Sequence, residues 1–271
     1  MKFSGWPEVK ESLMAGRIKA AYFLAPLAMD LADKGVPIKI VTLGHRSGAV
    51  IMVKADAPFR TMRDLRGKRV AVPSRYAVDY LFVRRLLKQQ GMAPSDVQIV
   101  EMNPPDMPAA LYAGAVSAYA TGEPFGAVAE KAGYARPLYM TRTEWPNYLC
   151  CVLTLRDELI QAERPRIQQL VNYLMSVGTW LEHSRENRYR AAEIAASPRF
   201  FNQKPDVLRF VLENPPDRVV YGDLRMVRAE FDEMMRLALE AGILSRPVAY
   251  EKYVDESFVK NFQPVAVTLP K

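Results

Sequence analysis

Short apolar runs and amphipathic stretches alternate along the first part of the chain. The continuous apolar runs at 18–24, 38–43 and 49–53 predict buried strands, because a strand covered on both faces shows no polar alternation. Residues 7–15 and 27–34 carry apolar side chains at helical spacing, and a glycine follows each stretch. This order predicts a β–α–β arrangement with helices on the faces of a sheet.

The same alternation resumes after a charged stretch at 54–68. Residues 148–155 form another apolar run that leads out of this second part, and helical patterns dominate from there to the end. We expect the strands of the second part at 69–73, 97–100 and 116–120, and its helices at 76–90, 104–112 and 125–132.

The two βα runs predict an α/β fold of two lobes with parallel-rich sheets and flanking helices. The first lobe would comprise residues 1–54 and 151–271 and the second residues 55–150, with hinges near 53–56 and 147–153. Ligands of open parallel sheets bind outside the carboxyl ends of the strands. We therefore expect the loops at these ends to converge on a cleft between the lobes.

Composition and charge narrow the possible ligands. The 271 residues are 49% hydrophobic, which allows a substantial core. Lysine and arginine number 37 against 30 acidic residues, and this net charge of +7 favours an anionic ligand or nucleic acid. The basic residues are scattered and no helix-turn-helix pattern precedes the lobes, so we expect no nucleic-acid partner.

The cysteines and histidines give no pattern typical of a metal site. The chain has two cysteines, Cys150 and Cys151, and two histidines, His45 and His183, which are far apart in sequence. Their spacing does not match a zinc motif, so we expect neither a metal nor a cofactor. Neighbouring residues of a strand point to opposite faces, so one thiol should enter the core and the other point outward. A redox role would require a lowered thiolate pKa.

No apolar stretch is long enough to cross a membrane, and no secretory signal follows Met1. Taken alone, these observations indicate a cytoplasmic protein.

Five motifs occur in the order found in one known family. The chain resembles the nitrate/sulfonate/taurine-type solute-binding proteins of ABC transporters, which include a thiamine-precursor type. The resemblance implies a periplasmic-binding-protein-like fold (type II) without enzymatic activity, a periplasmic location, and an ABC transporter permease as partner. The motifs are the residues at 6–9, 20–26, 44–53, 65–73 and 121–125.

The beginning of the chain departs from the family pattern. Members of this family normally start with a signal sequence or lipid anchor, followed by a strand, a helix and a second strand. This chain starts where that second strand should be ending, so we expect a first lobe that is incomplete at its N-terminus, through truncation or a misassigned start. The location would be cytoplasmic if Met1 is the true start. Membrane contact would come only through the permease or a missing lipid anchor.

Two polar loops are the strongest candidates for binding an anion. Ser74 and Arg75 precede the helix expected to start at Tyr76, where free N–H groups and the helix dipole favour an anion. Ser74 would add a hydroxyl donor and Arg75 a planar guanidinium, although Ser74 is equally typical of an N-cap. The second loop, 45–48, interrupts two apolar strands, and the resemblance places ligand contacts there.

Glu123 follows a strand and precedes a helix that starts with a proline. Its carboxylate could accept a hydrogen bond from a ligand or pair with Arg75 or Lys68, but a purely structural role at a helix start is slightly favoured. Trp6 is expected either to wall the pocket, as in some relatives, or to anchor the first helix. The predicted ligand-binding residues are Trp6, Ala25, Pro26, His45, Arg46, Ser47, Gly48, Ser74, Arg75, Tyr76, Gly122 and Glu123.

The expected function is the solute-binding component of an ABC importer, which closes by hinge motion on a small anionic or polar solute. Nitrate, bicarbonate, an alkanesulfonate and a pyrimidine precursor of thiamine all remain open as that solute. The alternatives are a cytoplasmic ligand sensor of the same fold that acts on a partner regulator and, less favoured, an enzyme resembling the pyrimidine-precursor synthases. The enzyme is disfavoured because Cys150 and Cys151 do not lie in a cysteine-rich run and no catalytic cluster is apparent.

Overall fold

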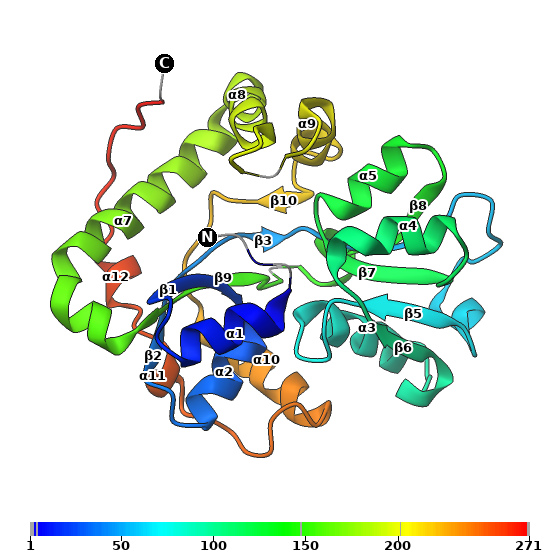
Figure 1. Ribbon diagram of the computed structural model, residues 1–271, viewed down its shortest axis with the longest axis horizontal. Coiled ribbons are helices and arrows are strands. Elements are labelled where there is room, and N and C mark those ends of the chain that lie inside the picture. Colours follow the sequence, from blue (N-terminus) through cyan, green and yellow to red (C-terminus); the bar gives the residue numbers. More distant parts are fainter. Residues whose placement is uncertain (1–2, 4, 147, 201, 270–271) are drawn as a thin grey trace. The chain divides into compact units, whose positions relative to one another are not determined.

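The computed structural model describes residues 3, 5–146, 148–200 and 202–269. The chain divides into two compact units, each built from separate stretches of sequence. Each unit has its own sheet and its own helices, labelled in Figure 1. Unit 1 consists of Met1–Trp6, Ser47–Tyr148 and Ala192–Val219, and unit 2 of Pro7–Arg46, Leu149–Ala191 and Val220–Lys271.

The sheet of unit 2 has three strands, and its central strand is β9 (Cys151–Arg156). β1 (Ala20–Leu24) and β2 (Ile38–Leu43) flank β9, and both run antiparallel to it. β9 is therefore hydrogen-bonded on both sides, which fixes its register. The side chains of β9 and β2 that face α7 and α12 form an apolar core with those helices, in which Phe258 is almost completely buried.

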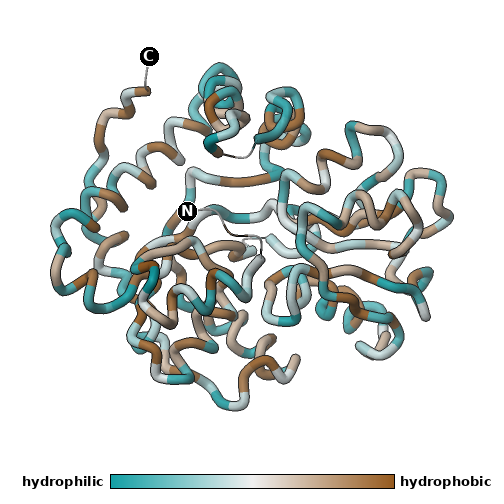
Figure 2. Tube along the Cα trace, in the orientation of Figure 1, coloured by the Kyte–Doolittle hydropathy of each residue, from teal (hydrophilic) through white to brown (hydrophobic). Residues whose placement is uncertain are grey.

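The helices of unit 2 pack around this sheet. Hydrophilic and hydrophobic residues alternate along α7, as expected for a helix that covers a core (Figure 2). Within the part of the chain that the structure describes, no helix combines the length and the apolar character needed to cross a bilayer. The helices are α1 (Trp6–Met14), α2 (Ala25–Asp33), α7 (Asp157–His183), α10 (Arg228–Glu240), α11 (Tyr250–Tyr253) and α12 (Ser257–Lys260).

Unit 1 contains a five-stranded mixed sheet of order β6-β5-β7-β4-β8. β5 runs parallel to β6 and β7, whereas β4 runs antiparallel to β7 and β8. The strands are β4 (Ala49–Lys54), β5 (Arg69–Val72), β6 (Gln98–Glu101), β7 (Ala118–Gly122) and β8 (Ala135–Met140).

Helices cover both faces of this sheet (Figure 1). Val50 and Met52 of β4 and Tyr119 of β7 pack with α4 and α5 in one apolar core. The helical segments of this unit are η1 (Met62–Leu65), α3 (Val78–Gln89), η2 (Pro94–Asp96), η3 (Pro104–Asp106), α4 (Met107–Tyr112), α5 (Phe125–Lys131), α6 (Thr141–Glu144) and α9 (Pro205–Glu213). Apart from α1, whose first residue Trp6 is assigned to unit 1, three elements contain residues of both units: α8 (Arg185–Ala196) and the paired strands β3 (Arg46–Ser47) and β10 (Val219–Val220).

The predicted α/β fold with flanking helices is confirmed, but the sheets are not parallel-rich, because β4 and β9 both run antiparallel to their neighbours. A continuous apolar run shows burial on two faces but carries no information on strand direction. The strand β8 was not predicted, since Pro137 interrupts its pattern. β8 lies at the edge of the sheet, where a strand tolerates proline.

The boundaries of the units also differ from those predicted. The crossing predicted after Lys54 falls instead between Arg46 and Ser47, because β4 is hydrogen-bonded between β7 and β8 and so belongs to unit 1. The return crossing falls between Tyr148 and Leu149, and Asn147 of the predicted hinge lies outside the described residues. Residues 192–219 belong to unit 1 rather than to the lobe of the helical tail.

Gly178 of α7 allows the segment at Tyr221 to lie directly against the helix. A Cβ at position 178 would stand 2.1 Å from the carbonyl oxygen of Tyr221, which is backbone and cannot rotate away. We expect Gly178→Ala to lower the free energy of unfolding by about 1–3 kcal/mol through overpacking. The matched control Gln169→Ala, on the exposed side of the same helix, should change it by less than about 0.5 kcal/mol in urea denaturation. Equal effects would contradict this packing.

Candidate functional site

The chain around His45 pairs antiparallel with the chain around the two cysteines. Leu43 lies opposite Val152 in the ladder, and the N–H of Gly44 donates to the carbonyl oxygen of Cys151 at 2.7 Å. The same register continues through a bridge between Arg46 and Leu149. His45 therefore lies opposite Cys150, where side chains of paired strands come close together.

Gly44 makes this close pairing possible by having no side chain. A Cβ there would stand 3.0 Å from the ring of Tyr22 and 3.3 Å from the carbonyl oxygen of Cys151. Gly44 thus allows the two segments of the chain to approach closely. Gly48, at the other end of the loop, has a φ of 88°, which favours glycine.

His45, Cys150 and Cys151 form a cluster of potential metal ligands in unit 2. Their imidazole nitrogen and thiol sulfur atoms all lie within 4.8 Å of one another. The two sulfur atoms are 3.9 Å apart. Cys150 is buried, whereas His45 and Cys151 are partly accessible.

The expectation that the two thiols point in opposite directions was wrong. Cys150 lies just before β9, outside the regular ladder that begins at Cys151, so the strict alternation of a strand does not govern it. The clustering of His45 with both cysteines was not expected from their spacing in sequence. His45 is about a hundred positions away in sequence, and only the pairing of the two chains brings it to the cysteines.

The neighbours of Cys151 favour its thiolate form. A hydrogen bond with the Cys150 thiol has the largest effect on the pKa of Cys151, burial opposes it, and the hydrogen bond and positive charge of His45 act in the same direction as Cys150. Together they lower the pKa of Cys151 to about 5. A thiolate is the form of cysteine that acts as nucleophile and as metal ligand.

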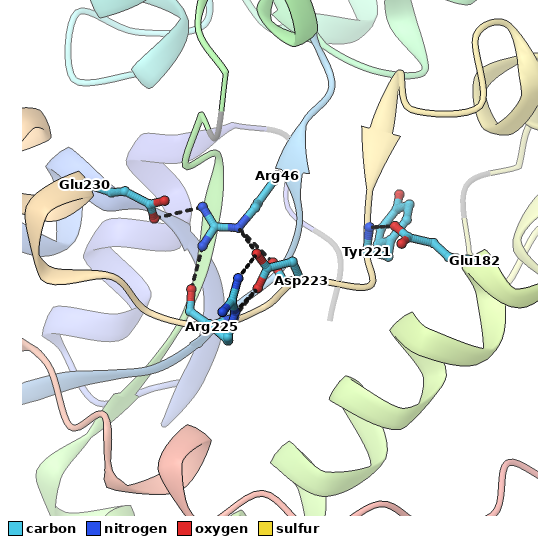
Figure 3. A network of polar contacts seen from close by, with 6 residues as sticks. All are labelled: Arg46, Glu182, Tyr221, Asp223, Arg225 and Glu230. Carbon is cyan, nitrogen blue, oxygen red and sulfur yellow. Dashed lines mark hydrogen bonds and ion pairs between the residues drawn. The ribbon is translucent and has the colours of Figure 1, made fainter.

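Arg46 lies beside this cluster, and the protein itself binds its guanidinium (Figure 3). Its side chain is 4% exposed. Its Nε donates to the carbonyl oxygen of Asp223 at 2.8 Å, one Nη donates to Glu230 at 2.8 Å, and the other donates to the carbonyl oxygen of Arg225 at 2.6 Å. Arg46 therefore fastens the segment before α10 to the loop that carries His45.

Tyr221 packs against the other side of the His45 loop. The two rings lie 5.8 Å apart at a tilt of 48°. The N–H of Tyr221 donates to Glu182 of α7 at 2.5 Å, as Figure 3 shows, and Gly178 supports the Tyr221 carbonyl from the same helix. The ring of His45 is thus held between the cysteines and an aromatic side chain whose backbone is fixed to a long helix.

In unit 1 the predicted residues Ser47, Gly48, Gly122 and Glu123 lie together. The N–H of Glu123 donates to the carbonyl oxygen of Gly48 at 2.8 Å, and Gly122 pairs with Ala49 in the ladder of β4 and β7. Ser47 is buried and has a φ of 56°, an unusual conformation for a residue other than glycine. The N–H of Ser47 donates to the carbonyl oxygen of Tyr148.

Glu123 pairs with Arg218, not with Arg75 or Lys68 as its position suggested. One carboxylate oxygen of Glu123 accepts from Arg218, and the other accepts the N–H of Ala127 at 2.9 Å. Arg218 also pairs with Glu130 at 2.8 Å, and both Arg218 and Glu123 are almost completely buried. No local pattern pointed to Arg218, because the pair joins positions 95 residues apart.

Ser74, Arg75 and Tyr76 form a turn that precedes α3. The helix begins at Val78 with Ala77 as its N-cap, so the prediction that it starts at Tyr76 behind Ser74 was wrong. The Ser74 hydroxyl instead accepts the N–H of Tyr76 at 3.1 Å within the turn. Arg75 is half exposed and lies 3.5 Å from Glu101.

The remaining predicted residues lie at helix starts. Ala25 and Pro26 occupy the first turn of α2, directly after β1 ends at Leu24, and both are buried. Trp6 is the first residue of α1 and is partly buried. Ala25, Pro26, His45 and Arg46 thus belong to unit 2, and the predicted residues from Ser47 to Glu123 belong to unit 1.

The sequence and fold place the chain in a known family. Residues 1–196 match the NMT1-like family, so the chain belongs to that family. The fold is periplasmic-binding-protein-like. The ligand-binding component of an ABC-type import system from Staphylococcus aureus, whose structure has zinc bound, is 32% identical, with a TM-score of 0.85 over 98% of this chain and 88% of that one.

Two of the similar proteins are named for nitrate import. The nitrate import ATP-binding protein NrtC of Synechococcus elongatus is 28% identical over 73% of this chain, and the nitrate/nitrite binding protein NrtA of Nostoc is 23% identical over 83%. The chain spans only 32% and 55% of the length of these two proteins. The periplasmic nitrate-binding protein NrtA from Synechocystis, at 16% identity over 96% of this chain and 78% of that one, has the same fold with a TM-score of 0.85.

The role of Glu123 as a buried ion-pair partner predicts a large loss of stability on its neutralisation. Glu123→Gln should lower the free energy of unfolding by about 3 kcal/mol. This value is at the lower end of the range for breaking a buried ion pair, because Arg218 keeps Glu130 as a partner. The exposed pair of Arg236 and Glu240 provides the control. Glu240→Gln should cost less than about 1 kcal/mol in urea denaturation. Comparable losses for the two variants would contradict the structural role of Glu123.

The environment of Cys151 predicts an ionised thiol at neutral pH. In the reduced, metal-free protein, thiolate absorbance in the ultraviolet should show one group titrating near pH 5, since the pKa of Cys151 is lowered to about 5. His45→Ala should move this transition to higher pH, and Cys151→Ser should abolish it. His183→Ala is the matched control and should leave it in place. A wild-type protein whose thiols both titrate above pH 8 would contradict the arrangement.

Proposed function

We propose that this protein is the solute-binding component of an ABC import system and delivers a small anionic or polar solute to a membrane permease. Membership of the NMT1-like family, together with 32% identity across 98% of the chain to a ligand-binding component of such a system, carries the proposal. The relatives named for nitrate import point to the same class of process. A binding role without catalysis follows from the same family membership.

An anionic solute fits the charge of the protein. The net charge of +7 attracts anions, and Arg75 offers a half-exposed guanidinium on a turn. Its contact with Glu101 joins two half-exposed groups at 3.5 Å, and such surface pairs contribute at most about 1 kcal/mol. Arg75 can therefore exchange this partner for a carboxylate, nitrate or sulfonate at little cost.

Among the predicted ligand residues, we propose His45, Ser47, Gly48, Ser74, Arg75 and Tyr76 as those that contact the solute. Arg46 and Glu123 have a different role in this proposal. Protein partners already bind the charged groups of both side chains, and breaking either set of contacts would leave a buried charge unpaired. We infer that Arg46 and Glu123 hold the loops in shape, and that any contribution of Gly122 comes through its backbone.

Hinge motion is the proposed mechanism of solute capture. The chain passes from one unit to the other at Trp6–Pro7, Arg46–Ser47, Tyr148–Leu149, Ala191–Ala192 and Val219–Val220. If each unit supplies part of the solute's contacts, binding shifts the population towards a closed form. The permease would then recognise that form. A periplasmic location, as in the Synechocystis structure, is part of the same proposal.

A thermal-shift screen tests this function. Nitrate, bicarbonate, short alkanesulfonates and a thiamine-precursor pyrimidine are added separately to the purified protein. We expect one class to raise the Tm, because a ligand at about 100 times its Kd stabilises the native state by about 2.7 kcal/mol. Failure of all four classes at millimolar concentration, with the protein folded, would contradict the proposal.

Matched arginine variants test the anion contact. Arg75→Gln should remove most of the shift without lowering the Tm of the ligand-free protein, because its ion pair is exposed. Arg236→Gln changes the net charge equally on the exposed surface of α10 and should keep the shift. An equal loss in both variants would mean that net charge, and not Arg75, attracts the solute.

A further inference from the structure

The geometry points to a binding site for one thiophilic d10 metal ion, for which Zn²⁺ is the probe, formed by His45, Cys150 and Cys151 in unit 2. Two thiol sulfurs and one imidazole nitrogen are ligand types that zinc and Cu(I) prefer over magnesium or calcium. The site lies within one unit and does not depend on a bound solute.

The distances between the two sulfurs and the imidazole nitrogen match those expected around one bound metal ion. With Zn–S bonds of 2.3 Å, two tetrahedral thiolate ligands lie about 3.8 Å apart, and the sulfurs of Cys150 and Cys151 are 3.9 Å apart. A histidine nitrogen bound to the same ion would lie about 3.6 Å from each sulfur. All three ligand atoms already lie within 4.8 Å of one another, so small side-chain rotations close the site.

A disulfide would need a much larger change. Its sulfurs must approach to about 2.05 Å, and bridging adjacent residues forces strained geometry on the chain between them. Simple apolar packing of two thiols does not explain why a polar imidazole lies against both of them. One metal ion can bind the imidazole nitrogen and both sulfurs at once.

The backbone holds the ligands in place before any metal binds. The hydrogen bond from Gly44 to Cys151 and the bridge between Arg46 and Leu149 fix the chain on both sides of His45 opposite the cysteines. The ring of Tyr221 packs against His45 from another direction. Ligands positioned by such rigid elements lose little entropy on metal binding.

Charge and access also suit the site. Two thiolates and a neutral imidazole would balance the charge of a divalent cation, so the partly buried site would carry no net charge. His45 and Cys151 are partly accessible, which leaves a route for the ion. Three protein ligands leave the fourth position of a tetrahedral ion open to water or another small molecule.

Metal binding to the reduced, chelator-treated full chain tests the proposal. Titration with Co²⁺ should produce a thiolate-to-cobalt charge-transfer band that saturates at one ion per chain, and Zn²⁺ should then displace the cobalt and bleach the band. Zn²⁺ should also protect both thiols from a thiol-reactive dye until a chelator is added. This second measurement needs no variant, so it holds even where a substitution impairs folding.

Three single variants define the ligand set. His45→Ala, Cys150→Ser and Cys151→Ser should each weaken Zn²⁺ binding at least tenfold in competition with a chromophoric chelator, since even groups one step removed from a metal change affinity by about 10–100-fold. His183→Ala, at the exposed end of α7, is the matched control and should keep full affinity.

Absence of the charge-transfer band, or thiols that stay reactive in excess Zn²⁺, would overturn the proposal. So would undiminished affinity in His45→Ala, since the cysteines alone would then bind the metal. All these measurements are made without solute. Their failure therefore leaves the transport proposal standing, and failure of the solute screen leaves the metal site standing.

Discussion

The antiparallel pairing of residues 43–47 with residues 148–152 is the constraint on which the arrangement of the site depends. β9 is hydrogen-bonded on both sides. Beyond the start of β9 the same register is kept by the hydrogen bond from Gly44 to Cys151 and by the bridge between Arg46 and Leu149. A shift of one residue would turn each side chain of this segment to the opposite face. His45 would then face away from the cysteines, and the buried Arg46 would lose its partners.

Two buried arginines complete this framework, each by joining segments far apart in sequence. Arg46 binds the segment at 223–230 in unit 2, and Arg218 binds Glu123 and Glu130 in unit 1. Buried ion pairs contribute little net stability compared with apolar packing, but they penalise alternatives that leave one charge unpaired. Their effect here is to specify one position for each loop.

Much of the fold could be predicted from the sequence, because its strands are continuous apolar runs and its helices end at glycines. Strand direction could not be predicted, since parallel and antiparallel buried strands have the same apolar pattern. The edge strand β8 was missed because Pro137 interrupts its pattern. The loop at 45–48 was recognised as a polar interruption, but its contacts were not. Cys150, Cys151 and Arg218 meet their partners only through tertiary pairing across roughly a hundred residues, for which one sequence carries no local signal.

The register of the pairing is the central claim, and the amide hydrogen of Gly44 reports on it directly. This hydrogen is bonded to Cys151, so its exchange with solvent, measured by NMR, should be as slow as that of the ladder amides of β9. Exchange at the rate of an unprotected loop amide would contradict the pairing, and with it the placement of His45 beside the two cysteines.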